Sequence, residues 1–156
     1  LHLRTRRQRQ MCIRDRNTIT KRLQKSLRTM FDTKKPTVLL LGRWQPWHDG
    51  HFALFQRAIK KTGQVLIGVR DVQDHNSESN PFSFNEIKNE IKSKLLDHGY
   101  REDFDYQIQL IPNITNITYG RDVGYVFEQE KFEEQIEAIS ATKIRKKLRE
   151  EGKLEN

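Results

Sequence analysis

Cysteine is nearly absent from this chain of 156 residues, since its one cysteine is Cys12. A disulfide framework and a thiolate metal site are therefore excluded for the rest of the sequence, and a reducing cytoplasm is the expected compartment. Long hydrophobic runs are missing too, because the longest aliphatic run is Val38–Leu41, far short of a membrane span. Residues 1–35 also lack the apolar stretch of a signal peptide, so no membrane partner is expected.

Acidic residues are scarce only at the front of the chain, which makes the net charge of +8 uneven. Residues 1–35 carry 12 Lys+Arg and 2 Asp+Glu, whereas residues 36–156 carry 17 Lys+Arg and 19 Asp+Glu. A net charge of +8 alone would suggest a nucleic-acid binder. The part of the chain with core-type patterns is close to neutral, however, so no nucleic-acid partner is expected.

Residues 1–29 show no core-type hydrophobic pattern, and we expect a basic extension that is either disordered or foreign to the natural protein. Met30 lies just before the first apolar run, so natural translation is expected to start there or between Met11 and Met30. The alternative is a basic arm for RNA or an acidic membrane, because residues 18–31 place apolar side chains on one face of a helix. The domain itself is expected to span residues 36–152.

Apolar runs and amphipathic runs alternate through the remaining sequence. Continuous apolar runs predict buried parallel strands, and apolar residues at helical spacing predict helices between them. The expected strands are 37–42, 64–69, 106–111 and a short fourth at 123–128, and the expected helices are 52–61, 83–96 and 140–151. Ser83 and Glu86 form a capping box at the start of the second helix. This order predicts an α/β fold, a single domain with a Rossmann-like parallel sheet flanked by helices.

The segment GRWQPWHDGH at residues 42–51 lies between the first expected strand and the first expected helix. Ligands in such sheets bind beyond the carboxyl ends of the strands. Gly50 lets the helix start approach a ligand closely, and the free N–H groups there make an anion site. His48 and His51 fall on one side of this start and are candidates to donate to phosphate oxygens. A histidine pair at this spacing is also compatible with a metal, and Pro46 with a simple turn.

A second segment, ISATKIR at residues 139–145, lies at the start of the last expected helix. Ser140 is expected to cap that helix, and Thr142 adds a hydroxyl. Arg145 lies one turn further on and can bind two phosphate oxygens with its guanidinium, with Lys143 nearby. Alone this pattern is an ordinary helix start, and it points to phosphate only together with the first segment.

Together the two segments resemble the H-x-G-H and I-S-S-T-x-x-R signatures of the nucleotidylyltransferase superfamily. The nearest branch contains the archaeal-type nicotinamide-nucleotide adenylyltransferases, and the wider group includes cytidylyltransferases for glycerol phosphate and choline phosphate. Ala141 replaces the second Ser of the signature, which removes a hydroxyl but keeps the backbone amides. The resemblance implies catalytic roles for His48, His51 and Arg145. It implies nucleotide contacts from Gly42, Arg43, Gln45, Gly50, Ser140, Thr142 and Lys143.

Polar side chains after the third expected strand are weaker candidates. Two interpretations apply to these side chains: they contact a base or an acceptor, or they are loop residues without a ligand role. The residues are Asn113, Asn116, Tyr119, Arg121 and Asp122. The archaeal adenylyltransferases carry a different segment here, so this stretch does not point to a nicotinamide acceptor. Residues 80–82, Asn-Pro-Phe, resemble a segment of the same branch, but a turn before the helix explains them equally well.

The expected reaction transfers a nucleotidyl group, with AMP favoured, from a nucleoside triphosphate to a small phosphorylated metabolite and releases pyrophosphate. Such an acceptor is largely anionic at neutral pH, because its second pKa is about 6, and needs no general base. Mg²⁺ is expected to come with the triphosphate, and no protein metal site is expected.

Three alternatives stay open. The first is a CTP-dependent cytidylyltransferase acting on a polyol or alcohol phosphate, and the second is a non-catalytic nucleotide- or RNA-binding module. The third is a fragment of a class I aminoacyl-tRNA synthetase, which shares an H-x-G-H loop but needs a longer chain. A homo-oligomer is also left open.

Overall fold

The structure is a computed structural model that describes residues 29–72, 77–121 and 124–154. The chain divides into two units, Leu1–Met30 and Phe31–Asn156, and the fold below is that of the second. Apart from Thr29, the expected extension at residues 1–29 lies outside the described residues.

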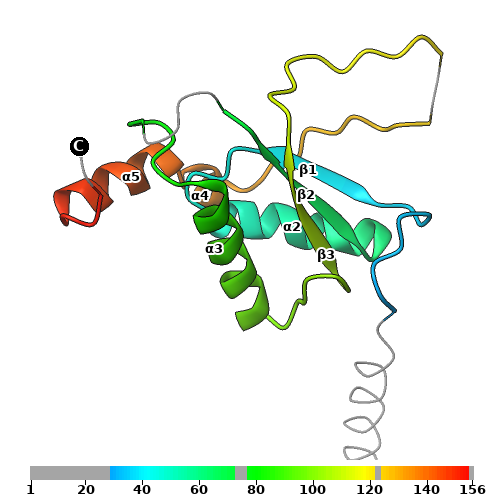
Figure 1. The fold of residues 1–156 in the computed structure, drawn as a ribbon, viewed down its shortest axis with the longest axis horizontal. Coiled ribbons are helices and arrows are strands. Elements are labelled where there is room, and N and C mark those ends of the chain that lie inside the picture. The colour runs from blue at the N-terminus through cyan, green and yellow to red at the C-terminus, as the bar shows by residue number, and fades with distance from the viewer. Residues whose placement is uncertain (1–28, 73–76, 122–123, 155–156) are drawn as a thin grey trace, which may run out of the picture. The chain divides into compact units, whose positions relative to one another are not determined.

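Three parallel strands form the sheet, in the order β1 (Val38–Gly42), β2 (Val65–Arg70) and β3 (Tyr106–Ile111). The helices α2 (Asp49–Thr62) and α3 (Phe84–Asp97) connect them (Figure 1). Gly42 pairs with Val69, and Arg70 with Ile111, so all three strands end at the same end of the sheet. The predicted Rossmann-like parallel sheet is confirmed, and the loops after the strands start close together.

The core lies between the sheet and its two connecting helices. Side chains alternate along a strand, so Val65, Ile67 and Val69 share one face of β2, and all three are buried. They join one apolar cluster with residues of α2 and α3, which include Phe55, Ala58, Ile87, Ile91 and Leu95. Leu39 and Leu41 lie on the opposite face of β1 and are 50% and 39% exposed.

The helix expected at 52–61 extends over Asp49–Thr62, and residues at the ends of both connecting helices explain where α3 begins and α2 ends. Ser83 caps α3 with its side chain, which accepts a hydrogen bond from the backbone N–H of Glu86 while the Glu86 carboxylate accepts from the Ser83 backbone. The predicted capping box is therefore confirmed. Gly63 ends α2 with a left-handed φ of 79°, which a residue without Cβ adopts freely.

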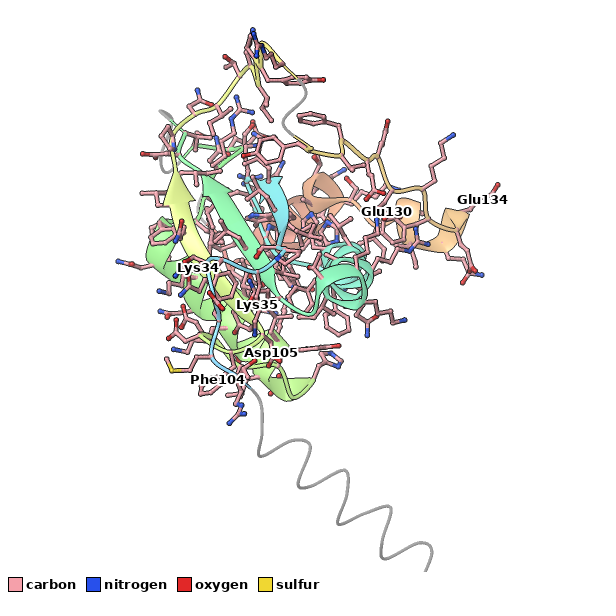
Figure 2. The ribbon with its side chains drawn as sticks, turned by 90° about the vertical axis from the view of Figure 1, so that its right-hand side faces the viewer. Lys34, Lys35, Phe104, Asp105, Glu130 and Glu134 are labelled. Carbon is pink, nitrogen blue, oxygen red and sulfur yellow. The ribbon has the colours of Figure 1, made fainter. Side chains whose placement is uncertain are left out.

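The chain after β3 returns to the helices without a further strand in its described residues. The predicted strand at 123–128 is wrong for Gly124–Glu128, which have no strand partner and lie exposed. Ion pairs hold the returning segment instead, from Arg57 of α2 to Glu130 and from Lys61 to Glu128 and Glu130. Figure 2 shows Glu130 on this segment, with Glu134 further along it.

Two helices complete the described chain. The short α4 (Glu134–Glu137), which the sequence patterns did not predict, leads into α5 (Ala141–Glu150). The position of α5 agrees with the expected helix at 140–151. Among the described residues, no helix combines the length and the apolar composition that crossing a membrane requires.

Candidate active site

The loop from β1 to α2 is packed by its two tryptophans. Trp44 is buried with a left-handed φ of 54°, which is uncommon for a residue with a side chain. Its indole donates a hydrogen bond to the carbonyl of Gly68 at 3.0 Å, and this bond helps to hold the unusual backbone in place. A Cβ at Gly42 would lie 2.9 Å from the same indole, so Gly42 gives Trp44 the room it needs.

His48 is the N-cap residue of α2. Its Nδ1 accepts a hydrogen bond from the backbone N–H of Gly50 at 3.2 Å. Burial lowers the pKa of His48, which keeps the ring neutral near pH 7. Since Nδ1 uses its lone pair as an acceptor, the neutral ring carries its proton on Nε2. His48 is therefore a cap and also presents one N–H donor.

His51 lies one turn further on and supports the His48 ring. The two imidazoles stack with their centroids 3.6 Å apart, and the Trp44 ring meets His51 edge-on at 4.8 Å. Burial, followed by the charges of His48 and Lys94, lowers the pKa of His51 to about 3. Its Nδ1 is buried and has no hydrogen-bond partner within the described part of the chain. The stack brings together the two histidines that the sequence singled out.

Gly50 makes room for the His48 ring. A Cβ at Gly50 would lie 3.0 Å from Cε1 and 3.1 Å from Nδ1 of His48. The sequence suggested that this glycine admits a ligand, whereas its observed neighbour is the catalytic candidate itself.

Arg145 joins α5 to the same loop. Its guanidinium is buried and donates from Nη1 to the carbonyl of Gln45 at 2.6 Å and from Nη2 to the Thr142 hydroxyl at 3.2 Å. Burial, and then the charges of Arg43 and Arg149, lower the pKa of Arg145. Positive charges that lie close together repel one another, and a bound anion would offset this repulsion.

The start of α5 differs in one respect from its expected form. Ser140 occupies the N-cap position, but its side chain makes no capping hydrogen bond. The predicted N-cap position of Ser140 is therefore confirmed, but the hydrogen bond expected from its side chain is not formed. Lys143 lies exposed in the first turn.

The other residues expected at the nucleotide make contacts within the protein. The buried amide of Gln45 donates to the carbonyl of Phe82 and accepts from its N–H, which ties the loop to the start of α3. Arg43 donates to the Asn80 side chain at 3.3 Å. Roles for Gln45 and Arg43 at the nucleotide stay predictions.

The four expected acceptor residues that the structure describes do not line the pocket beside His48. Asn113 accepts from Arg70 at the end of β2, and Asn116, Tyr119 and Arg121 lie exposed on the long segment after β3. Asp122 lies outside the described residues. Tyr119 stacks on Phe127 of the returning segment with centroids 5.8 Å apart.

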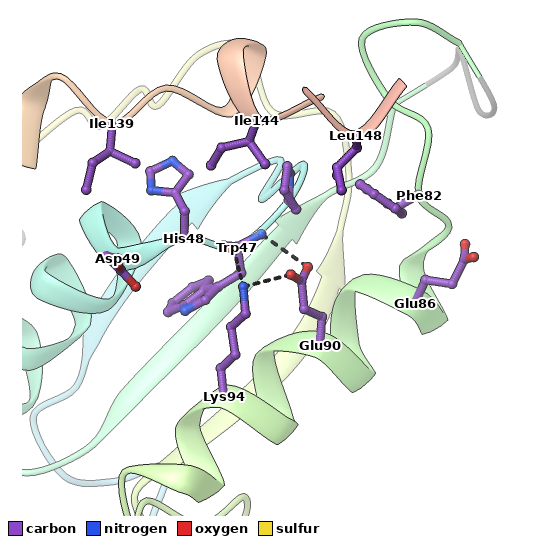
Figure 3. Close-up of a pocket in the computed structure, with 11 residues that line it drawn as sticks. Trp47, His48, Asp49, Phe82, Glu86, Glu90, Lys94, Ile139, Ile144 and Leu148 are labelled. Atoms are coloured by element: carbon purple, nitrogen blue, oxygen red, sulfur yellow. Dashed lines mark hydrogen bonds and ion pairs between the residues drawn. The ribbon is translucent and has the colours of Figure 1, made fainter. Parts of the chain in front are cut away.

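A pocket of about 600 Å³ lies beside His48, between α3 and α5, and we call it the His48 pocket (Figure 3). Its walls are mostly apolar, from Pro46, Trp47, Phe82, Ile139, Ile144 and Leu148. Its charged residues are Asp49, Glu86, Glu90 and Lys94. Figure 3 shows the His48 ring on the side of Ile139 and Ile144.

A second pocket of about 520 Å³ lies along α5 and is rich in basic side chains. Arg145, Lys146 and Arg149 line it together with Thr142, opposite Glu78 and Ser79. Arg149 donates to the Glu78 carbonyl at 2.8 Å, while its buried Nε has no partner among the described residues. Sequence reasoning missed Arg149, because a basic residue late in a helix is ordinarily a solvated one.

The start of α2 lies after β1, at the carboxyl end of the sheet, which is where α/β domains commonly bind nucleotides. Archaeal nicotinamide-nucleotide adenylyltransferases are similar to this chain. That of Methanococcus maripaludis (strain C5 / ATCC BAA-1333) is 26% identical over 129 residues, 70% of this chain and 75% of the relative. That of Methanolobus tindarius is 31% identical over 91 residues, 54% of this chain and 53% of the relative. No family model matches the chain.

The chain is related to the nucleotidylyltransferase family, and the relatives it matches are enzymes named as adenylyltransferases. The superfamily and the enzyme class predicted from the two segments are thereby confirmed.

Proposed function

We propose that the protein transfers AMP from ATP to a small phosphorylated acceptor and releases pyrophosphate. The observation that carries the proposal is that Arg145 of α5 bonds to the same loop that leads into the start of α2. His48 caps α2 and presents its Nε2–H there, and Arg145 of α5 is bonded to Gln45 of the same loop. The relatives' name supports ATP as the donor and nicotinamide mononucleotide as the first acceptor to test.

In the proposed reaction, a phosphate oxygen of the acceptor attacks the α-phosphorus of the triphosphate. The bond from the α-phosphorus to the oxygen that bridges to the β-phosphate breaks, and pyrophosphate leaves with the electron pair. The acceptor oxygen carries negative charge at neutral pH, so no side chain has to remove a proton. The Nε2–H of His48 donates to phosphate charge that grows in the transition state, and the Arg145 guanidinium neutralises charge on the triphosphate.

Mg²⁺ supplies further charge neutralisation when it arrives bound to the triphosphate. Across the described residues, no three His, Cys, Asp or Glu side chains gather into a metal site. In the proposal, the ion would be held mainly by phosphate oxygens and water. The proposed location is a reducing cytoplasm, because the chain beyond Cys12 contains no cysteine.

A pyrophosphate-release screen tests the proposal, with four triphosphates against nicotinamide mononucleotide, glycerol phosphate and choline phosphate. Release with ATP and nicotinamide mononucleotide, with the dinucleotide as product, is the expected result. Release only with CTP would establish the cytidylyltransferase alternative. No release with any pair, combined with salt-dependent retention on RNA, would establish the binding module instead.

A further inference from the structure

An ion pair on α3 holds both backbone polar groups of Trp47. The Glu90 carboxylate accepts from the Trp47 backbone N–H at 3.2 Å, and the Lys94 ammonium donates to the Trp47 carbonyl at 2.6 Å. Glu90 and Lys94 also bond to each other at 2.9 Å. Figure 3 shows the three interactions as dashed lines on the α3 side of the pocket.

These bonds fix the peptide group that leads into His48. The N–H of Trp47 belongs to the peptide before this residue, and its carbonyl belongs to the peptide that joins it to His48. Holding both groups sets the two backbone dihedrals of Trp47, whose side chain is itself only 1% exposed. The backbone of Trp47 thus sets where the His48 side chain starts. The hydrogen bond from the Gly50 N–H to Nδ1 and the stack on His51 then determine the direction of the His48 ring.

We propose that Glu90 and Lys94 are positioning residues that aim the Nε2–H of His48 at the transferred phosphate. This inference rests on the proposed function, because it assumes that His48 acts on phosphate charge. Neither residue touches the reacting atoms in this account, and both act through the Trp47 peptide. A donor of this kind is effective only when its geometry is set before the reaction.

The Glu90–Lys94 pair differs from the other ion pairs of α3 in what it contacts. Lys88 and Lys92 of the same helix bond to Glu102, side chain to side chain. The Glu90–Lys94 pair instead supplies an acceptor and a donor to backbone groups of the loop, 43 and 47 residues away in sequence.

The charges of the pair also reach the imidazoles. Burial is the main cause of the lowered pKa of His48, and Lys94 lowers it further while Glu90 raises it. Lys94 also contributes to the lowered pKa of His51. Lys94 therefore favours the neutral form of both rings, whereas Glu90 opposes it at His48.

Lys94→Met tests the proposal, with Lys92→Met as its matched control. Both lysines lie on α3 and are about half exposed, and each forms an ion pair with a glutamate. Only Lys94 also bonds to the Trp47 carbonyl. We expect Lys94→Met to lower the single-turnover rate of transfer by roughly 100-fold, with ATP affinity changed by less than about threefold. Lys92→Met is expected to match the wild type in both quantities.

A second measurement reports on His48 without any reaction. Nitrogen-15 NMR of the imidazoles, with His48→Asn used to assign the signal, should show His48 protonated at Nε2 in the wild type and in Lys92→Met. In Lys94→Met we expect a mixture of the two neutral tautomers. The proposal is overturned if Lys94→Met matches Lys92→Met in either the rate or the His48 spectrum. If the wild type transfers no nucleotide, the proposed function has failed, and the spectrum alone decides whether the pair positions His48.

Discussion

The two nitrogens of the His48 ring have separate tasks. Nδ1 accepts from the N–H of Gly50 and so caps α2, while Nε2 keeps the proton that a phosphate oxygen can accept. A single contact therefore sets both the helix start and the tautomer. Under the proposed function, this double use is a physical reason for a histidine at the N-cap in place of the more usual Ser or Asp.

Gly50→Ala is the most conservative way to disturb this ring. The added Cβ would meet Cε1 of His48 at 3.0 Å, so the imidazole has to shift by a few tenths of an ångström. Alanine favours a helix over glycine by up to about 1 kcal/mol, so the melting temperature should stay level or rise. Turnover should nevertheless fall roughly tenfold, because the donor moves. Thermal melts and kcat check this, and unchanged turnover would mean that the ring position is unimportant.

His51 should make the folded protein sensitive to acid. Its pKa is about 3 in the folded protein, against about 6.5 in an unfolded chain, so the unfolded chain binds the proton first as pH falls. Stability is therefore intact above pH 6.5 and is lost from there toward pH 3, by about 2 kcal/mol at pH 5. Urea unfolding of the wild type and His51→Phe at pH 7.5 and pH 5 measures the difference. Equal losses in the two proteins would contradict the buried neutral ring.

At the scale of elements, α5 is connected to the histidine loop through Arg145. Arg145→Lys keeps the charge but cannot bond to Gln45, Thr142 and a phosphate at once. Affinity for ATP should fall by roughly 10- to 100-fold, the loss expected for one hydrogen bond to a charged group. Lys147→Met is the matched control, since Lys147 lies exposed on the same helix. Calorimetry checks both variants, and equal affinities would remove Arg145 from the triphosphate site.

Elements with local signals were predictable from the sequence. The capping box depends only on Ser83 and Glu86, which are three residues apart. β3 occupies the predicted residues 106–111, and the apolar residues that indicate it all lie within that short segment. The predicted strand at 123–128 failed because a strand requires a neighbour, which Tyr125–Phe127 do not have. Pairing is a long-range property that an apolar run alone does not establish.

The residues at the site were predictable only in part. The segment around His48 and the one around Arg145 are recognisable as signatures, so the sequence placed them at one site. Glu90 and Lys94 carry no such signal, because opposite charges four residues apart on a helix usually form a surface pair. Their contacts with Trp47 depend on how α3 packs against the loop, which only the structure provides.

At the scale of the whole molecule, the basic charge and the site belong to different parts of the chain. Residues 1–35 hold 12 of the 29 Lys+Arg, whereas every site residue lies beyond them. Deleting residues 1–29 should therefore leave the thermal melt and the turnover of the protein unchanged. A shortened protein that is unfolded or inactive would show instead that the extension is part of the enzyme.

The most direct test of the account is the single-turnover transfer of AMP from α-labelled ATP by wild type, His48→Ala and His48→Asn. Asparagine can accept the Gly50 hydrogen bond, so it keeps the cap, whereas alanine should destabilise the protein by about 1 kcal/mol. Both variants lose the Nε2–H donor, and both should transfer roughly 10²–10³ times more slowly, with ATP affinity little changed. Near-normal transfer by the stably folded His48→Asn protein would contradict the central claim, as would a wild type that transfers no AMP.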